Sequence, residues 1–362
     1  PVACGYQHND SFPGKHPLAL GPLGYNGSKA AMEIISKADV VLALGTRLNP
    51  FSTLPGYGID YWPKEAKIIQ VDINSDRIGH AKKVSVGICG DAKLVAQQIL
   101  DQLSSSAGDV GREDRKALIH QTKSAWLQTL TSLDHEEDDE GTSWNKDSRD
   151  RDPDRMSPRM AWRAIQAGLP EEAIISSDIG NNCAIGNAYP TFEKGRKYLA
   201  PGLFGPCGYG FPSVLGAKIG CPDTPVVGFS GDGAFGISMS EMTSCNREEW
   251  PNITMVIFRN YQWGAEKRNT TLWYDNNFIG TELDPKLSYA KIAEACGFKG
   301  VKVTTQSELT EALKTSCVEQ MNGITTFIEV ILNQELGEPF RRDAMKAPVE
   351  VAGIDSKDTV VQ

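Results

Sequence analysis

A glycine turn that carries a carboxylate is the strongest chemical signal in the sequence. An apolar segment at 225–230 runs into Gly231-Asp232-Gly233-Ala234, which predicts a buried strand, a tight turn and the start of a helix. The backbone N–H groups at such a helix start can hold an anion. Because the carboxylate of Asp232 would repel a phosphate at the same place, we expect a cation between them. The turn therefore predicts a metal ion that bridges Asp232 and a diphosphate.

Asn260 is the expected second ligand of this metal ion. It follows the next predicted strand, at 253–259, and lies 28 residues after Asp232, which leaves room for one helix and one strand. Right-handed crossovers between parallel strands place both residues at the carboxyl edge of one sheet. Mg²⁺ prefers oxygen ligands and is usually held by a few protein groups together with phosphates. A carboxylate, an amide oxygen and a backbone carbonyl from the turn at 261–264 would suit it.

Two other interpretations of the glycine turn stay open. The run from Gly231 to Gly236 fits the dinucleotide pattern G-x-G-x-x-G formally. That pattern has no use for a carboxylate at the position of Asp232, and it wants an acid at the end of the next strand to hold a ribose. This strand instead ends in Arg259-Asn260, although an arginine could suit a 2′-phosphate. The turn could also be a surface turn without any ligand.

The elements that position these residues alternate along the chain. Apolar runs predict strands and amphipathic runs predict helices, and their alternation indicates parallel sheets flanked by helices. A length of 362 residues suggests two domains, so we expect an α/β protein with two such domains. The predicted strands lie within 38–45, 67–73, 173–178, 225–230, 253–259 and 325–332, and the predicted helices within 24–37, 90–103, 111–133, 157–168, 212–219, 238–246, 288–296 and 307–321.

The segment between the two predicted domains divides into a helix and an acidic stretch. Residues 134–155 are polar and acidic without an apolar period, so we expect a solvated or disordered connector. The helix predicted at 111–133 should have an apolar side that packs against the protein. The residues expected on that side are Leu118, Trp126, Leu127, Leu130 and Leu133.

Composition and charge exclude several classes of protein. The net charge of −9 argues against a nucleic-acid partner, because phosphate binding requires a basic surface. The sequence has no run of about 18 apolar residues, so we expect no membrane span. Its eight cysteines include no C-x-x-C pair, which is typical of reduced thiols and predicts a cytoplasmic protein without a zinc site.

The turn at Asp232 and its spacing to Asn260 resemble the cofactor motif of thiamin-diphosphate enzymes of the pyruvate-oxidase and acetolactate-synthase superfamily. The resemblance implies that thiamin diphosphate and Mg²⁺ are the cofactors. It also implies that Asp232, the Asn260 side chain and the Gln262 carbonyl hold the metal ion. The family pattern ends in Asn-Asn, and only the second asparagine ligates the metal. This chain has Arg259-Asn260 there, so the ligand is kept.

Two further segments are similar to cofactor-binding parts of the same superfamily. Ser177-Asp178-Ile179-Gly180-Asn181-Asn182 resembles its strand-end turn at the diphosphate, which implies that Gly180, Asn181 and Asn182 line the cofactor. The stretch 204–212 resembles the segment that bends the cofactor. The resemblance implies that the Gly205 carbonyl accepts an N–H of the aminopyrimidine. It also implies that Cys207 lies between the two rings, where the family often has a bulkier aliphatic residue.

The resemblance also predicts the domain organisation. Residues 1–103 are similar to the Rossmann-like central domain, which binds FAD or ADP in some relatives, and we expect it to be incomplete at its start. Residues 104–156 would form a helix and the acidic linker, 157–350 the C-terminal domain that binds thiamin diphosphate and Mg²⁺, and 351–362 a tail. In this superfamily an N-terminal domain supplies a glutamate that activates the cofactor. We therefore expect a truncated sequence that is catalytically silent by itself.

Within the superfamily the sequence most resembles the sulfoacetaldehyde acetyltransferases, through the stretches 21–30, 262–269 and 335–344. These enzymes convert sulfoacetaldehyde and phosphate to acetyl phosphate and sulfite, in organosulfonate and taurine degradation. The resemblance implies a homodimer or homotetramer with these small-molecule substrates. An acetolactate-synthase-like or 2-oxoacid-decarboxylase-like enzyme remains an alternative, as does a silent cofactor-binding fragment. The candidate groups for binding the anionic reactants are Lys267, Arg268, Arg341 and Arg342.

Overall fold

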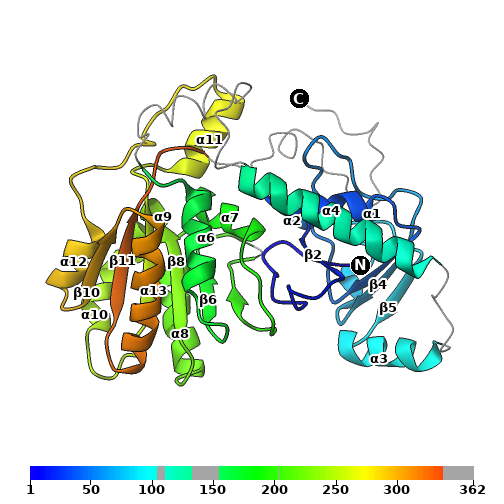
Figure 1. Ribbon diagram of the computed structural model, residues 1–362, viewed down its shortest axis with the longest axis horizontal. Coiled ribbons are helices and arrows are strands. Elements are labelled where there is room, and N and C mark those ends of the chain that lie inside the picture. Colours follow the sequence, from blue (N-terminus) through cyan, green and yellow to red (C-terminus); the bar gives the residue numbers. More distant parts are fainter. Residues whose placement is uncertain (104–110, 133–154, 203, 337–362) are drawn as a thin grey trace. The chain divides into compact units, whose positions relative to one another are not determined.

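The computed structural model describes residues 1–103, 111–132, 155–202 and 204–336 (Figure 1). The chain divides into two compact units. The described residues of the first unit fall within 1–6 and 16–129, and those of the second within 7–15 and 130–336. Neither the acidic stretch nor the tail at 351–362 can be compared with its prediction, because 133–154 and 337–362 lie outside the described residues. The predicted boundaries at 103, 156 and 350 stay predictions.

The first unit contains two small parallel sheets. The larger has the order β3-β4-β5 and the smaller pairs β1 with β2. Its helices alternate with these strands along the sequence, as in an α/β fold. The elements are β1 (Val2–Cys4), β2 (Ala19–Pro22), α1 (Lys29–Ile35), β3 (Val40–Leu44), α2 (Pro50–Thr53), β4 (Lys67–Asp72), β5 (Val86–Cys89), α3 (Ala92–Gln102) and most of α4 (Arg112–Ser132).

The second unit is built on a six-stranded parallel sheet with the order β10-β11-β9-β8-β6-β7. Its strands are β6 (Ile174–Ser177), β7 (Tyr198–Leu199), β8 (Val226–Gly231), β9 (Thr254–Arg259), β10 (Lys299–Val303) and β11 (Thr326–Ile331). Its helices are α6 (Pro158–Gly168), α7 (Asn181–Ile185), α8 (Gly210–Gly220), α9 (Asp232–Ser238), α10 (Met242–Cys245), α11 (Gly264–Trp273), α12 (Tyr289–Ala295) and α13 (Gln306–Met321).

The inner strands of this sheet, β6, β8, β9 and β11, are buried on both faces because helices cover each side. Along β9, Val256 and Phe258 face one core, which α6 and α13 close, and the two helices lie side by side in Figure 1. Met255 and Ile257 face the other core, together with residues of α8, α10 and α12. This alternation follows from the two-residue period of a strand, and continuous apolar runs are typical of parallel strands that are covered twice.

The predicted fold class is confirmed: the chain is an α/β protein with parallel sheets flanked by helices. Four strands of the second unit and two of the first lie where the sequence predicts them. The prediction missed short strands such as β5, β7 and β10, and it missed α11, which begins directly after the turn at Gln262. Short edge strands carry too few residues for a clear period, which explains why a sequence pattern does not reveal them.

Three helix predictions were wrong in detail. The helix expected within 24–37 covers only Lys29–Ile35, because Gly24 and Asn26 have positive φ and Ser28 caps the helix start. The region 238–246 contains the last residue of α9, a 3₁₀ turn and α10 instead of one helix. On α4, the buried apolar residues are Ile119, Trp126 and Leu130, whereas Leu118 and Leu127 are exposed. Leu133 lies outside the described residues.

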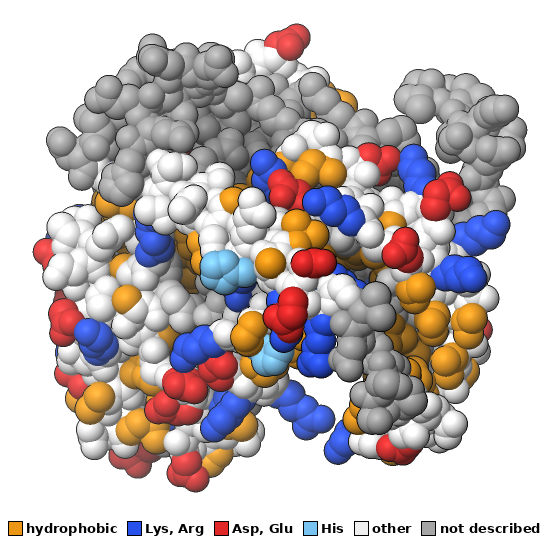
Figure 2. All heavy atoms as spheres, turned by 45° about the vertical axis from the view of Figure 1, so that its right-hand side comes forward, with side chains coloured by type: hydrophobic (Ala, Val, Ile, Leu, Met, Phe, Trp, Pro, Cys, Tyr) orange, Lys and Arg blue, Asp and Glu red, His pale blue; other side chains and the backbone are white. Residues whose placement is uncertain are grey.

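The surface carries charged side chains of both signs (Figure 2), as expected from a sequence with 37 Lys and Arg and 46 Asp and Glu residues. On the face drawn in Figure 2, basic and acidic side chains are interspersed. Among the described helices, none combines the length and the apolar character needed to cross a membrane. All eight cysteines belong to the described residues, and each carries a free thiol.

Candidate cofactor site

Asp232 lies where the sequence predicts it, at the first position of α9 directly after β8. Its carboxylate is buried and accepts three hydrogen bonds. Oδ1 accepts from the backbone N–H of Gly233 at 2.9 Å, and Oδ2 accepts from the backbone N–H of Tyr261 at 2.7 Å and from Arg259 Nη1 at 3.0 Å. The pKa of Asp232 is raised to about 6, because the effect of burial outweighs the lowering effects of the Arg259 charge and of these hydrogen bonds. The carboxylate is therefore fixed in place at the sheet edge.

Asn260 follows β9, the strand next to β8, and its side chain is buried. Neither its amide oxygen nor its amide nitrogen has a hydrogen-bond partner among the residues that the structure describes. A buried amide without a partner costs free energy, about 1–3 kcal/mol. Tyr261, the next residue, has a φ of 61°, which is uncommon for a bulky side chain and is typical of functional turns. Both features point to a ligand that Asn260 would contact.

The side chain of Gln262 is bound by protein groups, whereas its backbone carbonyl is the predicted metal ligand. The side chain donates from Nε2 to the Gln334 carbonyl at 2.8 Å and accepts from Lys267 Nζ at 3.0 Å. The bridge of Gln262 to Glu282 is made by flanking groups, since the N–H of Trp263 donates to the Thr281 carbonyl at 2.8 Å. This bridge therefore leaves the Gln262 carbonyl unused.

Arg259 is the site residue whose role the sequence analysis missed. Its guanidinium is fully buried and lies between Asp232 and Glu329, with Nε 3.8 Å from Glu329 Oε1. Nη2 donates to the Asp284 carbonyl. Because both terminal nitrogens donate to protein groups, the side chain neutralises a metal-ligand candidate instead of binding a 2′-phosphate. An arginine at the end of an otherwise apolar strand was the available signal, since a buried charge requires partners.

The turn after β6 lies beside Asn260. A Cβ on Gly264 would lie 3.3 Å from Asn181 Cβ and 3.7 Å from Asn260 Nδ2, so the two asparagines flank the same glycine. A Cβ on Gly180 or on Gly231 would meet no atom of the described residues within 4 Å, so the backbone at both turns faces open space. Asn182 is buried, and among the described residues its Oδ1 has no hydrogen-bond partner. The open backbone at the two turns leaves room for an anionic group, and the Asn182 oxygen can accept a hydrogen bond or a cation.

The segment expected to contact the cofactor rings follows β7. Gly205 has a φ of +67° and Gly208 a φ of +88°, conformations that glycine adopts readily. Cys207 lies between them and is exposed. Neighbouring atoms still remove part of the water around its thiol, which is the main cause that raises the thiol pKa, and the charge of Asp178 adds to it. Cys207 is therefore a small, accessible, neutral side chain at the tip of a glycine-rich turn.

The four predicted cationic groups fall into two sets. Lys267 and Arg268 are buried on α11. Lys267 Nζ donates to Gln262 and to Glu282, and Arg268 Nη1 donates to Asn181 Oδ1 at 2.9 Å. Both therefore fix residues at the carboxyl edge of the second unit's sheet, called the cofactor edge below because the candidate cofactor site lies there. Their catalytic roles stay predictions. The other set, Arg341 and Arg342, lies outside the described residues.

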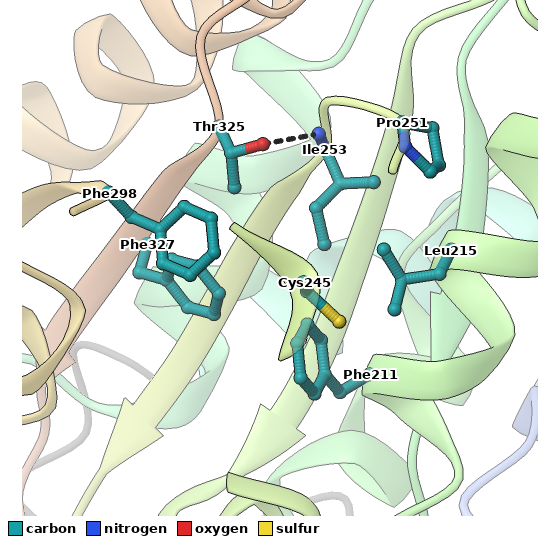
Figure 3. A pocket seen from close by; sticks show the side chains of 8 residues that line it. All are labelled: Phe211, Leu215, Cys245, Pro251, Ile253, Phe298, Thr325 and Phe327. Carbon is teal, nitrogen blue, oxygen red and sulfur yellow. Dashed lines mark hydrogen bonds between the residues drawn. The ribbon is translucent and has the colours of Figure 1, made fainter. Parts of the chain in front are cut away.

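An apolar pocket lies at the amino ends of the strands, away from the candidate site at their carboxyl ends. Figure 3 shows its lining, in which the Ile253 N–H donates to Thr325 Oγ1 at 3.2 Å. These two residues directly precede β9 and β11, so the pocket lies at the amino ends of the strands. Phe211, Leu215 and Phe327 close it so tightly that it has no room for a water molecule. It is part of the apolar core.

Comparison with known families agrees with this geometry. The family model for the C-terminal TPP binding domain of thiamine pyrophosphate enzymes matches residues 178–330, and the model for their central domain matches residues 1–99. Thiamine pyrophosphate is another name for thiamin diphosphate. The first match spans every strand-end turn described above. The chain therefore belongs to the thiamine pyrophosphate enzymes and carries their central and C-terminal domains.

The sequence identity differs between relatives within this family. The chain is 78% identical over 362 residues to a probable sulfoacetaldehyde acetyltransferase of Rhizobium meliloti (strain 1021), with 100% of this chain and 61% of the relative covered. It is 73% identical over 358 residues to the sulfoacetaldehyde acetyltransferase of Roseovarius nubinhibens, with 99% and 59% covered. A probable acetolactate synthase large subunit of Methanococcus aeolicus is 29% identical, with 83% and 48% covered. The chain thus spans about three fifths of the first two relatives.

Proposed function

We propose that the protein containing this chain is a sulfoacetaldehyde acetyltransferase that depends on thiamin diphosphate and Mg²⁺. It would convert sulfoacetaldehyde and phosphate into acetyl phosphate and sulfite. The identity of 78% to a relative with that name supports this substrate over those of the acetolactate synthases, where identity falls to 29%. No outside oxidant is needed, because the aldehyde carbon is oxidised to the acyl level while the carbon that loses sulfite is reduced to a methyl group.

The buried, unpartnered amide of Asn260 is the observation that carries the cofactor assignment. Its oxygen, a carboxylate oxygen of Asp232 and the Gln262 carbonyl would form an all-oxygen donor set at one sheet edge, which would suit Mg²⁺. The open backbone at Gly180 and Gly231 suits the diphosphate that such an ion would bridge. The residues present therefore fit both groups.

Each segment of the site has a role in this proposal. Bound thiamin diphosphate supplies a carbanion for attack on a carbonyl carbon. Asp232, Asn260 and the Gln262 carbonyl would hold Mg²⁺. The turns at Gly180-Asn181-Asn182 and Gly231-Asp232-Gly233-Ala234 would bind the diphosphate. Gly205 offers its carbonyl to the aminopyrimidine, and the side chain of Cys207 supports the rings.

The cationic residues would serve the anionic reactants in two ways. Arg268 orients Asn181 through its hydrogen bond, and Lys267 orients Gln262, so both act on the cofactor edge from the protein side. Arg341 and Arg342 would bind the sulfonate or the phosphate, since the planar guanidinium donates two parallel hydrogen bonds to paired oxygens. Two anionic reactants would otherwise repel each other in one site.

The remaining parts of the proposal concern the cellular setting. We propose a cytoplasmic homodimer or homotetramer that acts on small molecules in taurine and organosulfonate degradation, without a nucleic-acid or membrane partner. The formal charge of −9 supports small-molecule substrates over nucleic acid. Size measurement of the intact protein in solution tests the oligomeric state.

Product analysis of the intact gene product tests the reaction. With thiamin diphosphate, Mg²⁺, phosphate and sulfoacetaldehyde, we expect acetyl phosphate and sulfite in equal amounts. An acetolactate-synthase-like enzyme would instead form acetolactate from pyruvate, and that result would overturn the proposed substrate. Binding of thiamin diphosphate without turnover of either substrate would favour a silent cofactor-binding protein.

The arginine pair has its own test. Replacing both residues, as in Arg341→Gln with Arg342→Gln, should raise the KM for phosphate or for sulfoacetaldehyde by about 10–100-fold, because charge-assisted hydrogen bonds contribute about 1.5–3 kcal/mol. The affinity for thiamin diphosphate should stay the same. Unchanged KM and kcat values would show that the pair does not contact the reactants.

A further inference from the structure

The carboxylate of Asp178, at the cofactor edge, accepts four hydrogen bonds. It directly follows β6, and its side chain is fully buried. Oδ1 accepts from the backbone N–H groups of Ile179 at 2.8 Å and Gly208 at 3.1 Å. Oδ2 accepts from the backbone N–H of Gly210 at 2.8 Å and from the Ser230 hydroxyl at 3.1 Å. The pKa of Asp178 is raised, because the effect of burial outweighs the lowering effect of these four hydrogen bonds.

These bonds join three separate segments of the site. Ile179 belongs to the turn beside the diphosphate candidates, Gly208 and Gly210 to the segment that carries Cys207, and Ser230 to the end of β8. The backbone N–H of Asp178 also donates to the Phe229 carbonyl at 2.7 Å, which fixes Asp178 itself on β8. One carboxylate thus sets the position of the Cys207 segment relative to the two strand ends.

Close packing shows that this arrangement has little freedom. A Cβ on Gly210 would lie 3.1 Å from Asp178 Oδ2 and 2.8 Å from the Phe229 carbonyl oxygen, so a larger residue would force the segment away. Gly208 adds a positive φ of +88° that turns the chain toward the carboxylate. Cys207, directly before Gly208, remains exposed at the tip.

We propose that Asp178 is a positioning residue for the cofactor: it holds the segment from Gly205 to Gly210 in its binding conformation before the cofactor arrives. This inference rests on the proposed thiamin-diphosphate site. Asp178 does not touch the reacting atoms; it presents the Gly205 carbonyl and the Cys207 side chain. A segment held in advance loses less conformational freedom on binding, so the tether should increase cofactor affinity.

The test compares Asp178→Asn with Asp10→Asn in the intact protein. Asp10 provides a matched control, because its carboxylate also accepts two backbone N–H groups in the same unit, from Lys197 at 2.7 Å and Tyr198 at 3.1 Å. In cofactor-free protein, amide hydrogen exchange of the peptide covering 204–211 should become at least tenfold faster in Asp178→Asn only. In Asp10→Asn the faster exchange should be confined to the region of β7.

Calorimetric titration with thiamin diphosphate and Mg²⁺ completes the test. We expect the Kd to rise about 10–100-fold in Asp178→Asn and to stay within twofold in Asp10→Asn. Equal Kd values for Asp178→Asn and the wild type, with the segment exchanging faster, would overturn the proposal while leaving the cofactor site intact. Unchanged exchange at 204–211 would overturn the tether itself. Absence of binding by the wild type would instead refute the proposed function.

A milder variant keeps the test decisive if Asp178→Asn does not fold. Ser230→Ala removes only one of the four donors to the Asp178 carboxylate. It should speed exchange of the 204–211 peptide by a smaller factor in the same direction. Exchange identical to that of the wild type would count against the tether.

Discussion

The sheets of the two units differ in how completely their strands are covered. In the second unit, β9 and β11 are buried along their whole length. In the first unit, β3 exposes Val40, Leu42 and Leu44 to 54%, 44% and 41%, all on one face because they alternate in sequence. The candidate site is built on the sheet that is covered on both faces. Rigid strand ends are what a site needs when it must hold several oxygen atoms in place.

The strand-end carboxylates of the two units sharpen this contrast. Asp72 ends β4 in the first unit, and its Oδ1 accepts from the backbone N–H of Asn74 at 2.9 Å, within its own turn. Asp232 follows β8 in the second unit and accepts from residues of the neighbouring strand end. A carboxylate at the carboxyl end of a parallel strand is thus not by itself a site. The adjacent strand must supply the charge and the second ligand.

The largest expected effect is the loss of cofactor binding in Asp232→Ala. The substitution removes the only carboxylate of the proposed metal-ligand set, so Mg²⁺ would lose its charged ligand. We expect no measurable binding of thiamin diphosphate by calorimetry in the presence of Mg²⁺. The matched change in the first unit, Asp72→Ala, should leave the Kd unchanged. Equal effects of the two substitutions would remove the distinction between the two strand ends.

Arg259→Met should give the next largest effect, on stability. It leaves Asp232 and Glu329 buried without their shared cation, and breaking a buried ion pair costs about 3–5 kcal/mol. Denaturant unfolding of the second unit should show this loss. Arg77→Met in the first unit, where the arginine is exposed, should change the free energy of unfolding by less than about 0.5 kcal/mol. A small effect at Arg259 would mean that the pair does not stabilise the sheet edge.

Asn260→Ala should separate binding from stability. Removing an oxygen ligand of the metal should raise the Kd for thiamin diphosphate with Mg²⁺ about 10–100-fold, as expected from a charge-assisted contact of about 1.5–3 kcal/mol. The melting temperature of the cofactor-free protein should stay the same or rise, because the amide has no hydrogen-bond partner among the described residues. A fall in melting temperature with unchanged Kd would show that the amide serves the fold instead.

The smallest expected effects come from the same substitution, valine to alanine, in one strand of each sheet. They test how completely each strand is buried. Val256→Ala in β9 removes two buried methyl groups and should cost about 2–3 kcal/mol. Val40→Ala in β3 should cost less than about 0.5 kcal/mol, because the side chain is half exposed. Both values come from denaturant unfolding of the intact protein. A large cost at Val40 would show that its face is covered there, and the contrast between the sheets would disappear.

Local pattern was enough to predict the elements that carry the candidate site residues, whose roles stay predictions. A buried strand, a glycine turn and a helix start are written in consecutive residues, and the spacing between Asp232 and Asn260 follows from one crossover. The sequence also predicted the α/β class, which the parallel sheets confirm. Edge strands and α11 escaped prediction, since they are short or lack a strong period.

Contacts between distant residues decided the rest. Arg259 meets Asp232 27 residues away and Glu329 on a third strand, and Asp178 meets Gly210 32 residues away. The sequence by itself determined which residue types arrive at the carboxyl edge, because strand periods and turn residues act locally. Only the tertiary structure decided which of them pair with one another and which amide is left for a ligand, because burial and hydrogen bonding depend on the neighbours that the strand order brings together.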